Sequence, residues 1–468
     1  MPSRREQIQS YQYLTQRVVN AFVSGEADPS MSPTRRLAGA GFASVMAAVL
    51  ALTVFGVIGL VKHGGNTSWQ DGGAIVIEKE TGTRYVYRDG VLYPVANYSS
   101  AVLVIGQPAT TVSVSRESLT GARRGPLIGI TGAPDALPPA GRMSRAAWSM
   151  CAVPGRDSSG GATVSSQIMV GTKPDGGRDL GDSAIVVREA LSQKSYLVWN
   201  AHRYRVDARQ TFAAMGIDAQ PRLLVDEAWL DTVPQGLPIT QPQVDNRGKT
   251  STALKNYLIG QVLTVSVGGS TTGYLVRDRD VVPVTPIEQA LILADPGTAA
   301  AYPGSTPQAR PIQAAEVANT PKAGRAKSDL DPPAQVPSMA DADTAGTLCT
   351  TFADGQAAPG FLINADPQPD NAGIATSGGG GTEQVATRVV VPSGSGAIVR
   401  AAQSADTESG QVFFVTDQGR RYALMSPAQL AWFGYGALKP IELPSFVVAR
   451  IPAGPGLDPR AAQRPVTG

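Results

Sequence analysis

The feature that most constrains this chain is a run of 25 residues without a charge, from Leu37 to Val61. A helix of that length covers roughly 37 Å at ~1.5 Å per residue, which exceeds the ~30 Å hydrocarbon layer of a bilayer. Buried helices of globular proteins rarely need so long an uncharged run. A cleaved signal peptide fits poorly, because 36 residues precede the run and no small-x-small cleavage site follows it. We therefore predict one transmembrane helix over 37–61.

The charges on the two sides of the span predict its direction. The 36 residues before it carry five arginines and three acidic residues. On the other side, only Lys62 lies close to the span. By the positive-inside rule, residues 1–36 should be cytoplasmic and the residues after the span extracytoplasmic. We expect a single-pass protein of the cell membrane with a small inner arm and a large outer region.

The N-terminal arm has the pattern of an amphipathic helix. Ser3 and Glu6 form an S-x-x-E capping box. Five apolar side chains then recur at spacings of 3, 3, 4 and 4, which places them on one helical face: Ile8, Tyr11, Leu14, Val18 and Phe22. No inner domain is large enough to bury this arm stripe, so we expect its five residues to dock on a partner protein. The alternative is a marginal helix that rests on the membrane surface.

Composition favours small β modules and argues against most catalytic chemistry. Glycine (51) and proline (36) make up 19% of the 468 residues, against roughly 12% in average proteins. Two histidines and two cysteines are too few for a zinc site of four cysteines or three histidines, and a mixed site would consume all four residues. A net charge of +2 is too small for a protein that neutralises nucleic-acid phosphates. We expect no metal, no cofactor and no nucleic-acid partner.

Four segments of the outer region share one pattern that aligns without a gap. Each has turn formers in its middle and period-2 apolar residues on both sides: YVYRDGVLYPV, YLVWNAHRYRV, YLVRDRDVVPV and FVTDQGRRYAL. The pattern predicts a β-hairpin with one buried face. We expect the first aromatic residue of each to be core: Tyr85, Tyr196, Tyr274 and Phe414. A helix N-cap candidate follows 11 or 12 positions later: Asn97, Asp207, Thr285 and Ser426. The repeated unit is therefore a hairpin plus a short helix, too small to bury its own face.

Two segments between the repeats, 121–190 and 346–405, are rich in Gly, Ser and Val, and each contains one cysteine. Because Cys151 and Cys349 lie on the oxidising side of the membrane, we predict a disulfide that joins both segments into one central β domain. The alternative is two unpaired buried thiols. Residues 302–345 are rich in Pro and Ala and are expected to form a flexible loop.

The expected fold is α+β and mainly β, with four hairpin-plus-helix repeats around a central β domain. In chain order, the predicted parts are the cytoplasmic arm (1–36), the transmembrane helix (37–61), repeat 1 (70–120), the first half of the central domain (121–190), repeat 2 (191–240), repeat 3 (255–300), the flexible loop (302–345), the second half of the central domain (346–405), repeat 4 (406–455) and a C-terminal tail (456–468).

Longer motifs, spread along nearly the whole chain in one order, resemble the EccB family. They are SRREQIQSYQYLTQRV before the span, GTRYVYRDGVLYPVANYSSAVLVIG and RGPLIGITGAPDAL after it, WSMC at 148–151, and GQVFFVTDQGRRYALMSPAQLAWFGYG and LPSFVVARIPAGPGLDPRAA near the end. EccB proteins are single-pass membrane components of actinobacterial type VII (ESX) secretion systems. The resemblance implies a complex with EccC, EccD and EccE membrane subunits, a mycosin protease and other EccB copies. Such a complex exports WXG-type proteins.

Three functions compete for this chain. The resemblance implies a structural subunit that anchors and assembles the outer part of the secretion complex. Some family members are labelled ATPases, but the G-K-[ST] of this chain is Gly248-Lys249-Thr250, and Gln243 stands where a P-loop needs its first glycine. A cell-wall-binding module would need exposed aromatic residues in a groove, whereas the aromatic residues of the repeats fit a core. We expect no catalytic residues.

Overall fold

The structure is a computed structural model that describes residues 3–25, 33–61, 67–206, 209–324, 326–369, 372–376, 384–402 and 410–466. Two long N-terminal helices precede a region in which the described residues form five β-sheets. The predicted fold class is confirmed: it is α+β and mainly β, with a helix at the N-terminus and one apolar helix that is a candidate for a membrane span.

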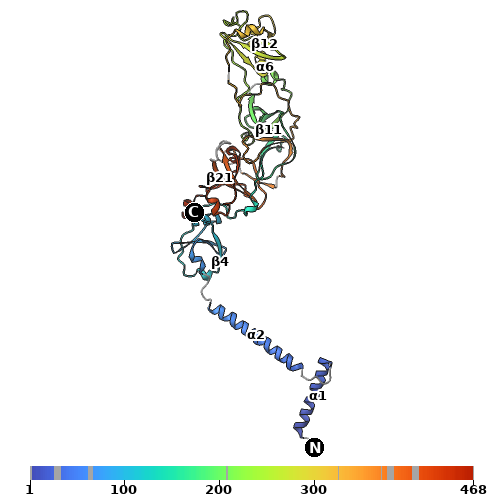
Figure 1. The fold of residues 1–468 in the computed structure, drawn as a ribbon, viewed down its shortest axis with the longest axis vertical. Helices are drawn as coiled ribbons and strands as arrows, with labels where there is room; N and C mark the ends of the chain where they lie inside the picture. Colours follow the sequence, from blue (N-terminus) through green and yellow to red (C-terminus); the bar gives the residue numbers. More distant parts are fainter. Residues whose placement is uncertain are drawn as a thin grey trace.

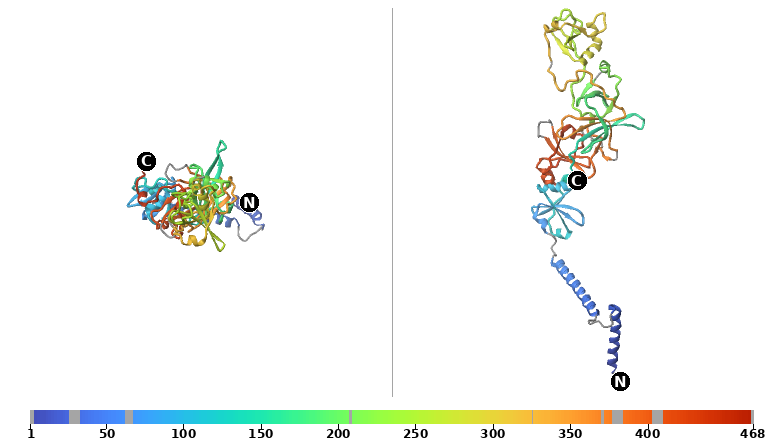
Figure 2. Two further views of the ribbon diagram at one scale, coloured as in Figure 1. Left: turned by 90° about the horizontal axis from the view of Figure 1, so that it is seen from above. Right: turned by 45° about the vertical axis from the view of Figure 1, so that its right-hand side comes forward.

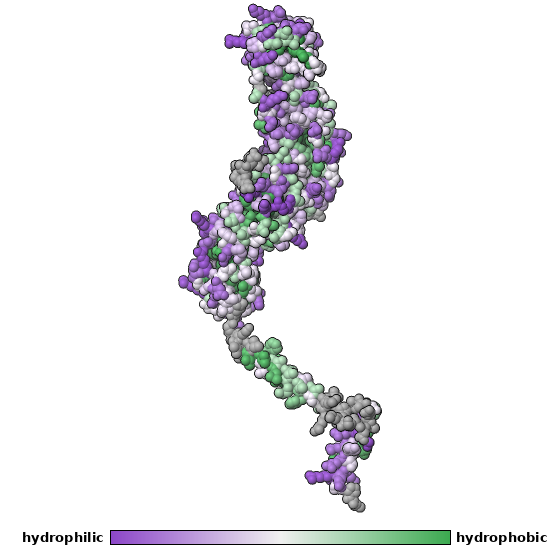
Figure 3. Space-filling model, in the orientation of Figure 1, coloured by the Kyte–Doolittle hydropathy of each residue, from purple (hydrophilic) through white to green (hydrophobic). Residues whose placement is uncertain are grey.

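The two long helices follow the local sequence signals. Helix α1 runs over Arg4–Ser24, and the backbone N–H of Ser3 donates to the carboxylate of Glu6 at 2.7 Å. Helix α2 runs over Pro33–Val61, and its stretch Ala38–Val57 is, among the described residues, the one helical segment long and apolar enough to cross a membrane. Figure 3 shows this stretch as a band of hydrophobic surface. The helix thus begins four residues before the predicted span.

Four of the sheets share one topology, and we call these units modules 1 to 4. Three antiparallel strands are followed by a short helix and a fourth strand that pairs in parallel with the first strand. Module 1 consists of β1 (Ala74–Glu78), β2 (Arg84–Arg88), β3 (Val91–Pro94), α3 (Tyr98–Ile105) and β4 (Thr110–Val114). Module 2 consists of β8 (Ile185–Glu189), β9 (Ser195–Trp199), β10 (His202–Val206), α4 (Arg209–Ala214) and β11 (Arg222–Val225).

The other two modules repeat this order of elements. Module 3 consists of β12 (Val262–Val267), β13 (Ser270–Val276), β14 (Val281–Val284), α6 (Pro286–Ala294) and β15 (Arg310–Pro311). Module 4 consists of β20 (Gly396–Ala402), β21 (Gly410–Thr416), β22 (Arg421–Ala423), α8 (Gln429–Trp432) and β23 (Ile441–Pro444). The repeated unit is therefore larger than the predicted hairpin plus helix, because a strand on each side completes the sheet.

The fifth sheet, which we call the central sheet, is built from two distant parts of the chain. Its strands are β5 (Trp148–Arg156), β6 (Ala162–Met169), β7 (Asp175–Asp179), β16 (Thr347–Phe352), β17 (Gly360–Asp366), β18 (Ile374–Ala375) and β19 (Arg388–Val390). Their spatial order is β18-β19-β6-β5-β16-β17-β7, so β5 and β16 lie side by side at its middle.

The modules and the central sheet are stacked in a rod. Figures 1 and 2 show the order module 1, module 4, central sheet, module 2, module 3. The helix sides of modules 1 and 4 share one hydrophobic core, and those of modules 2 and 3 share a second. A third core joins the opposite faces of modules 2 and 4 across the central sheet. Burial of apolar surface between successive layers therefore holds the rod together.

Several predicted boundaries differ from the sheets of the structure. The first central segment, 121–190, includes β8, which pairs with β9 of module 2. The second, 346–405, includes β20, which pairs with β21 of module 4. The segment 456–468 is no free tail, because α10 (Pro459–Ala462) packs on α3 of module 1. The hairpin pattern revealed neighbouring strands, but it carried no signal for the strand that precedes each hairpin.

Residues 302–345 differ most from their prediction. Within the described part of this segment, β15 completes the sheet of module 3 and α7 (Ala314–Ala318) follows it. Tyr302, Ile312, Val317 and Ala342 are buried. These single buried apolar residues fix an extended chain to the modules, whereas the composition of the segment alone predicts a flexible loop.

The predicted helix caps have mixed outcomes. Asn97 caps α3, and Thr285 caps α6 as part of a capping box. Ser426 lies two residues before Ala428, which is the N-cap of α8. Asp207 lies outside the described residues.

Turn length explains why the four hairpins do not align without a gap. The two-residue turns at 89–90 and 200–201 have positive φ at both positions and close the hairpins of modules 1 and 2. Module 4 has a three-residue loop at 417–419. As a result Phe413, rather than Phe414, is the structural equivalent of the first aromatic residue in the other modules.

The expectation that all four aromatic residues are core holds for two of them. Tyr85 is 4% exposed and Phe414 is fully buried. Tyr196 and Tyr274 are half-buried. The guanidinium of Arg203 lies 5.9 Å from the centre of the Tyr196 ring, at the boundary between core and solvent.

Each module also has an extended segment that covers the edge strand of its hairpin. In modules 1, 2 and 4 a glycine of this segment lies against the ring of a tyrosine on the edge strand, 32 residues earlier in the chain: Gly125 on Tyr93, Gly236 on Tyr204 and Gly454 on Tyr422. A Cβ at these glycines would come within 2.4 Å of the ring. Module 3 has Val282 in place of the tyrosine and Ala323 in place of the glycine, so the smaller side chain on the edge strand leaves room for a Cβ on the covering segment.

Candidate functional site

The two cysteines form a disulfide at the middle of the central sheet. Cys151 of β5 and Cys349 of β16 face each other in the antiparallel register and are 198 residues apart in sequence. Both are fully buried, among Met169, Ala365 and Val390. The bond therefore joins the part of the chain before modules 2 and 3 to the part after them.

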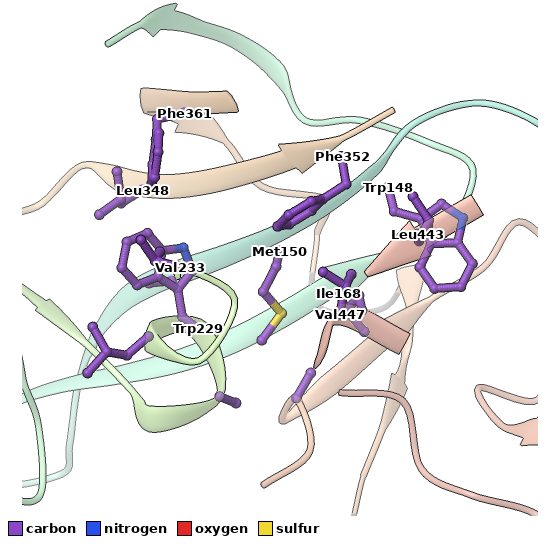
Figure 4. Close-up of a cluster of buried hydrophobic side chains, with 14 of the residues drawn as sticks. Trp148, Met150, Ile168, Trp229, Val233, Leu348, Phe352, Phe361, Leu443 and Val447 are labelled. Atoms are coloured by element: carbon purple, nitrogen blue, oxygen red, sulfur yellow. The ribbon is translucent and has the colours of Figure 1, made fainter. Parts of the chain in front are cut away.

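A second layer of large side chains surrounds the opposite face of these strands. Figure 4 shows Trp148 and Met150 of β5 close to Phe352 of β16. Trp229 of α5 (Glu227–Leu230), the helix that follows module 2, lies on one side, and Leu443 of module 4 lies on the other. All five are buried. The central sheet is thus the body on which modules 2 and 4 are fixed.

An ion-pair network links module 2 to the segment that follows module 4, and no local sequence pattern indicates it. Asp231, next to α5 (Glu227–Leu230), contacts Arg203 of module 2 at 3.3 Å and Arg450 at 3.2 Å. Arg450 follows α9 (Ser445–Val448) beyond module 4 and is 8% exposed. Asp231 and Arg450 are separated by 219 residues in the sequence, so no local pattern could pair them.

One carboxyl group at this junction has its pKa raised by burial. Asp226 caps α5 by accepting a hydrogen bond from the N–H of Trp229 at 3.0 Å. Burial raises the pKa of Asp226 above the usual range of an aspartate, although its hydrogen bonds oppose that shift. As the N-cap residue, Asp226 gives one backbone N–H at the start of this short helix a hydrogen-bond partner that the helix itself cannot provide.

The arm stripe is exposed along the whole of α1. The exposed fractions of its members are 54% for Ile8, 74% for Tyr11, 59% for Leu14, 57% for Val18 and 90% for Phe22. At 100° per residue they occupy an arc of about 120°. Large apolar side chains in one exposed row are typical of a contact surface.

The glycine-lysine-threonine motif does not have the surroundings of a P-loop. Residues 248–250 lie between α5 and β12, in a described segment that contains neither helix nor strand. The N–H of Gly248 donates to the carbonyl of Ile259, and the ammonium of Lys249 contacts the side-chain oxygen of Asn246 at 2.9 Å. A phosphate cradle requires a strand before the glycine-rich loop and a helix after it. The described residues also contain no cluster of His, Cys, Asp and Glu that could hold a metal ion.

Comparison with protein families decides which proteins share this architecture. The model of the type VII secretion system ESX-1 transport TM domain B matches residues 1–466. The chain belongs to the EccB family. The expected resemblance is confirmed over nearly its whole length.

Curated EccB relatives are distant but collinear. The chain is 24% identical to the ESX-3 secretion system ATPase EccB3 of Mycobacterium tuberculosis, over 97% of this chain and 88% of that protein. It is 25% identical to the ESX-1 secretion system ATPase EccB1 of Mycolicibacterium smegmatis, over 97% and 94%. The word ATPase belongs to the names of these relatives.

Solved EccB structures share the fold of this chain. A chain of an intact ESX-5 inner membrane complex matches with a TM-score of 0.62 at 23% identity, over 100% of this chain and 96% of that one. A chain of an EccB3 dimer from an ESX-3 core complex matches with a TM-score of 0.61 at 21% identity, over 84% and 100%.

Proposed function

We propose that this chain is a structural subunit of an ESX inner membrane complex, which anchors and assembles the extracytoplasmic part of a machine that exports WXG-type proteins. The observation that carries the proposal is the rod itself. Four modules and the central sheet share continuous hydrophobic cores, and the disulfide lies at their middle. Such a body suits a support that holds other subunits at fixed positions.

The proposed orientation places α1 in the cytoplasm and the rod outside the membrane. The excess of arginines before the span supports it through the positive-inside rule. The disulfide supports it independently, since disulfides form and persist in oxidising compartments.

The proposed partners are the other membrane subunits of the system, EccC, EccD and EccE, with a mycosin protease and further EccB copies. Membership of the EccB family supports this set, as do the related structures, which are of an ESX-5 inner membrane complex and of an EccB3 dimer. We assign the arm stripe to the contact with EccC or EccD, because anchoring alone is already provided by α2.

We further propose that the chain does not hydrolyse ATP itself. The surroundings of residues 248–250 support this, since they lack the strand and helix between which a P-loop holds phosphate. The motor would then be another subunit of the complex. A cell-wall-binding role receives no support from Tyr85 and Phe414, because both rings are buried.

Affinity purification of the tagged full chain from membranes in mild detergent, followed by mass spectrometry, tests the proposed function. We expect the other ESX membrane subunits to be recovered in stable proportion. Recovery of the chain alone, from cells in which those subunits are present, would refute it. Two variants with one added cysteine each, in a chain that keeps its disulfide, test the orientation. A membrane-impermeant maleimide should label Ser158→Cys in intact cells, and Ser10→Cys only after lysis.

A further inference from the structure

A cleft of about 580 Å³ lies on module 2, around the ends of its strands (β11 in Figure 1). It opens on the face of the sheet that carries α4, because Arg188, Ser195 and Val206 lie side by side in the register there. The volume is within the range of sites that take small organic ligands. Neither the proposed assembly role nor the disulfide uses this cleft.

Four basic side chains line the cleft, and one acidic side chain accompanies them. The basic residues are Arg188, Lys194, Arg209 and Arg222, and the acidic residue is Asp218. Four positive charges and one negative charge leave a formal charge of +3 on the lining residues. Several like charges around one concave surface concentrate counter-ions there.

None of the four basic side chains forms an ion pair with a residue that the structure describes. The Nε of Arg188 is buried and has no hydrogen-bond partner in the same residues. Arg222 lies over the ring of Phe212, 4.8 Å from its centre. The neighbouring carboxylate, Glu189, accepts hydrogen bonds from backbone N–H groups of its own loop, including that of Leu191 at 2.8 Å.

Module 4 shows what the same position looks like when it is neutralised. Arg400 occupies the place of Arg188, and Glu442 on the adjacent strand contacts it at 3.7 Å. In module 2 the residue in the place of Glu442 is Leu224. The register around Arg188 and Arg400 is the same in the two sheets, so Arg188 lacks the carboxylate that Glu442 provides in module 4.

We propose that this cleft binds a small oxyanion that carries two or three negative charges as phosphate or carboxylate groups. Guanidinium groups match both kinds of oxyanion with paired N–H donors, and hydrogen bonds between two charged groups are stronger than neutral ones. The hydroxyls of Ser192 and Ser195 at the rim add neutral donors. Residues 207 and 208, which follow β10 in the sequence, lie outside the described residues and are no part of the proposed site.

The proposal is tested by two calorimetric titrations of the full chain in detergent, one with inorganic pyrophosphate and one with citrate. We expect saturable binding of at least one probe, weakened by added salt. Arg188→Gln with Arg222→Gln should weaken it at least about tenfold. If only pyrophosphate binds, the site is specific for phosphate groups, and if only citrate binds, it is specific for carboxylate groups. Binding of both probes shows that the site accepts either kind of oxyanion.

Two further variants keep the test independent of folding. Lys194→Gln with Arg209→Gln removes two exposed charges of the cleft and should also weaken binding without changing the thermal midpoint. Arg123→Gln with Arg279→Gln removes two exposed charges elsewhere and should leave binding unchanged. Absence of binding by both probes would overturn the proposal, as would equal losses in the cleft variants and this control.

Discussion

Cys151 and Cys349 lie directly opposite each other on neighbouring antiparallel strands, with their Cα atoms 4.0 Å apart. The two cysteines are 198 residues apart in sequence, and the chain between them forms β6 and β7 of the central sheet and all of modules 2 and 3, whereas modules 1 and 4 lie outside this loop. The bond therefore joins the two ends of an excursion that makes up the distal half of the rod (Figure 1).

Removal of this bond should destabilise the middle of the rod. Closing a loop of this length is worth roughly 5 kcal/mol in the chain-entropy model, and measured values are often smaller. Replacing both cysteines with serine should lower the midpoint of the transition that unfolds the central sheet, followed by circular dichroism in detergent. Intact-mass analysis of the native protein after alkylation checks the bond directly. Two alkylated thiols without reductant would show that it does not form.

Truncation of the hairpin aromatic residues should have unequal costs. Phe414 is fully buried, so Phe414→Ala should cost about 3–5 kcal/mol in unfolding free energy. Tyr196 is half-buried, so Tyr196→Ala should cost clearly less, about 1–2 kcal/mol. Chemical denaturation of the two variants beside the wild type measures the difference. Equal costs would contradict the prediction, because they would show that the Tyr196 ring contributes as much to the core as the Phe414 ring.

Replacing the glycine of a covering segment with alanine should be tolerated only when the tyrosine that packs on it is replaced by a smaller residue. A Cβ at Gly236 would lie 2.3 Å from the ring of Tyr204, and overpacking of this kind costs about 1–3 kcal/mol. Tyr204→Val alone should also destabilise the module, but Gly236→Ala should cost less in that background, as the Val282–Ala323 pair of module 3 indicates. The remaining cost comes from the backbone oxygen of Leu330, which lies 3.1 Å from the same Cβ position. A double-mutant cycle by chemical denaturation gives the coupling.

Gly324→Ala is the matched control for this cycle, since its Cβ would meet no atom within 4 Å. It should leave stability unchanged in both backgrounds. If Gly236→Ala were as harmless as this control, the ring would not pack on the glycine as described.

The stability of module 1 should depend on pH through Glu78. Its carboxylate is buried and accepts from the Nε of Arg116 at 2.8 Å and from the hydroxyl of Tyr85 at 3.1 Å. The hydrogen bond with Arg116, with smaller help from Tyr85, lowers the pKa of Glu78 below its usual 4.5. The ionised group therefore stabilises the fold above pH 4.5, and this contribution disappears as pH falls through the lowered pKa.

Glu78→Gln should consequently lower the melting temperature at pH 7 and matter progressively less below pH 4.5. Melting curves of wild type and variant between pH 3 and pH 7 measure this difference. A constant difference across the range would show that the charge of Glu78 does not contribute.

Local patterns predicted the elements of this fold whose cause is local. The uncharged run gave α2, the spacing of Ile8 to Phe22 gave the exposed stripe of α1, and period-2 residues around turn formers gave the hairpins. Each of these depends on residues within one or two turns of the chain. The pairing of modules 1 with 4 and 2 with 3 has no such cause, since it arises between surfaces formed by distant segments.

The same limit applies to the polar contacts. Asp231 and Arg450 are separated by 219 residues, and nothing in the sequence around either one indicates the other. The edge-covering segments were missed because a glycine followed by a proline or leucine resembles any loop. Their meaning appears only when the tyrosine that packs on Gly125, Gly236 or Gly454 is known.

Assembly through the arm stripe is the central claim about function, and a charged stripe tests it most directly. Leu14→Asp with Val18→Asp places two carboxylates on the apolar face of α1, where burial against a partner would be costly. Gln9→Asp with Gln16→Asp adds the same charges to the opposite face and serves as the control. Membrane insertion depends on α2, so both variants should reach the membrane in normal amounts.

Native gel electrophoresis of detergent extracts from cells with the other ESX subunits gives the decisive readout. We predict that the control migrates with the full complex, whereas Leu14→Asp with Val18→Asp migrates as a small species and secretion stops. A full complex of normal size with continued secretion in the stripe variant would contradict the account, and would mean that α1 rests on the lipid surface without docking.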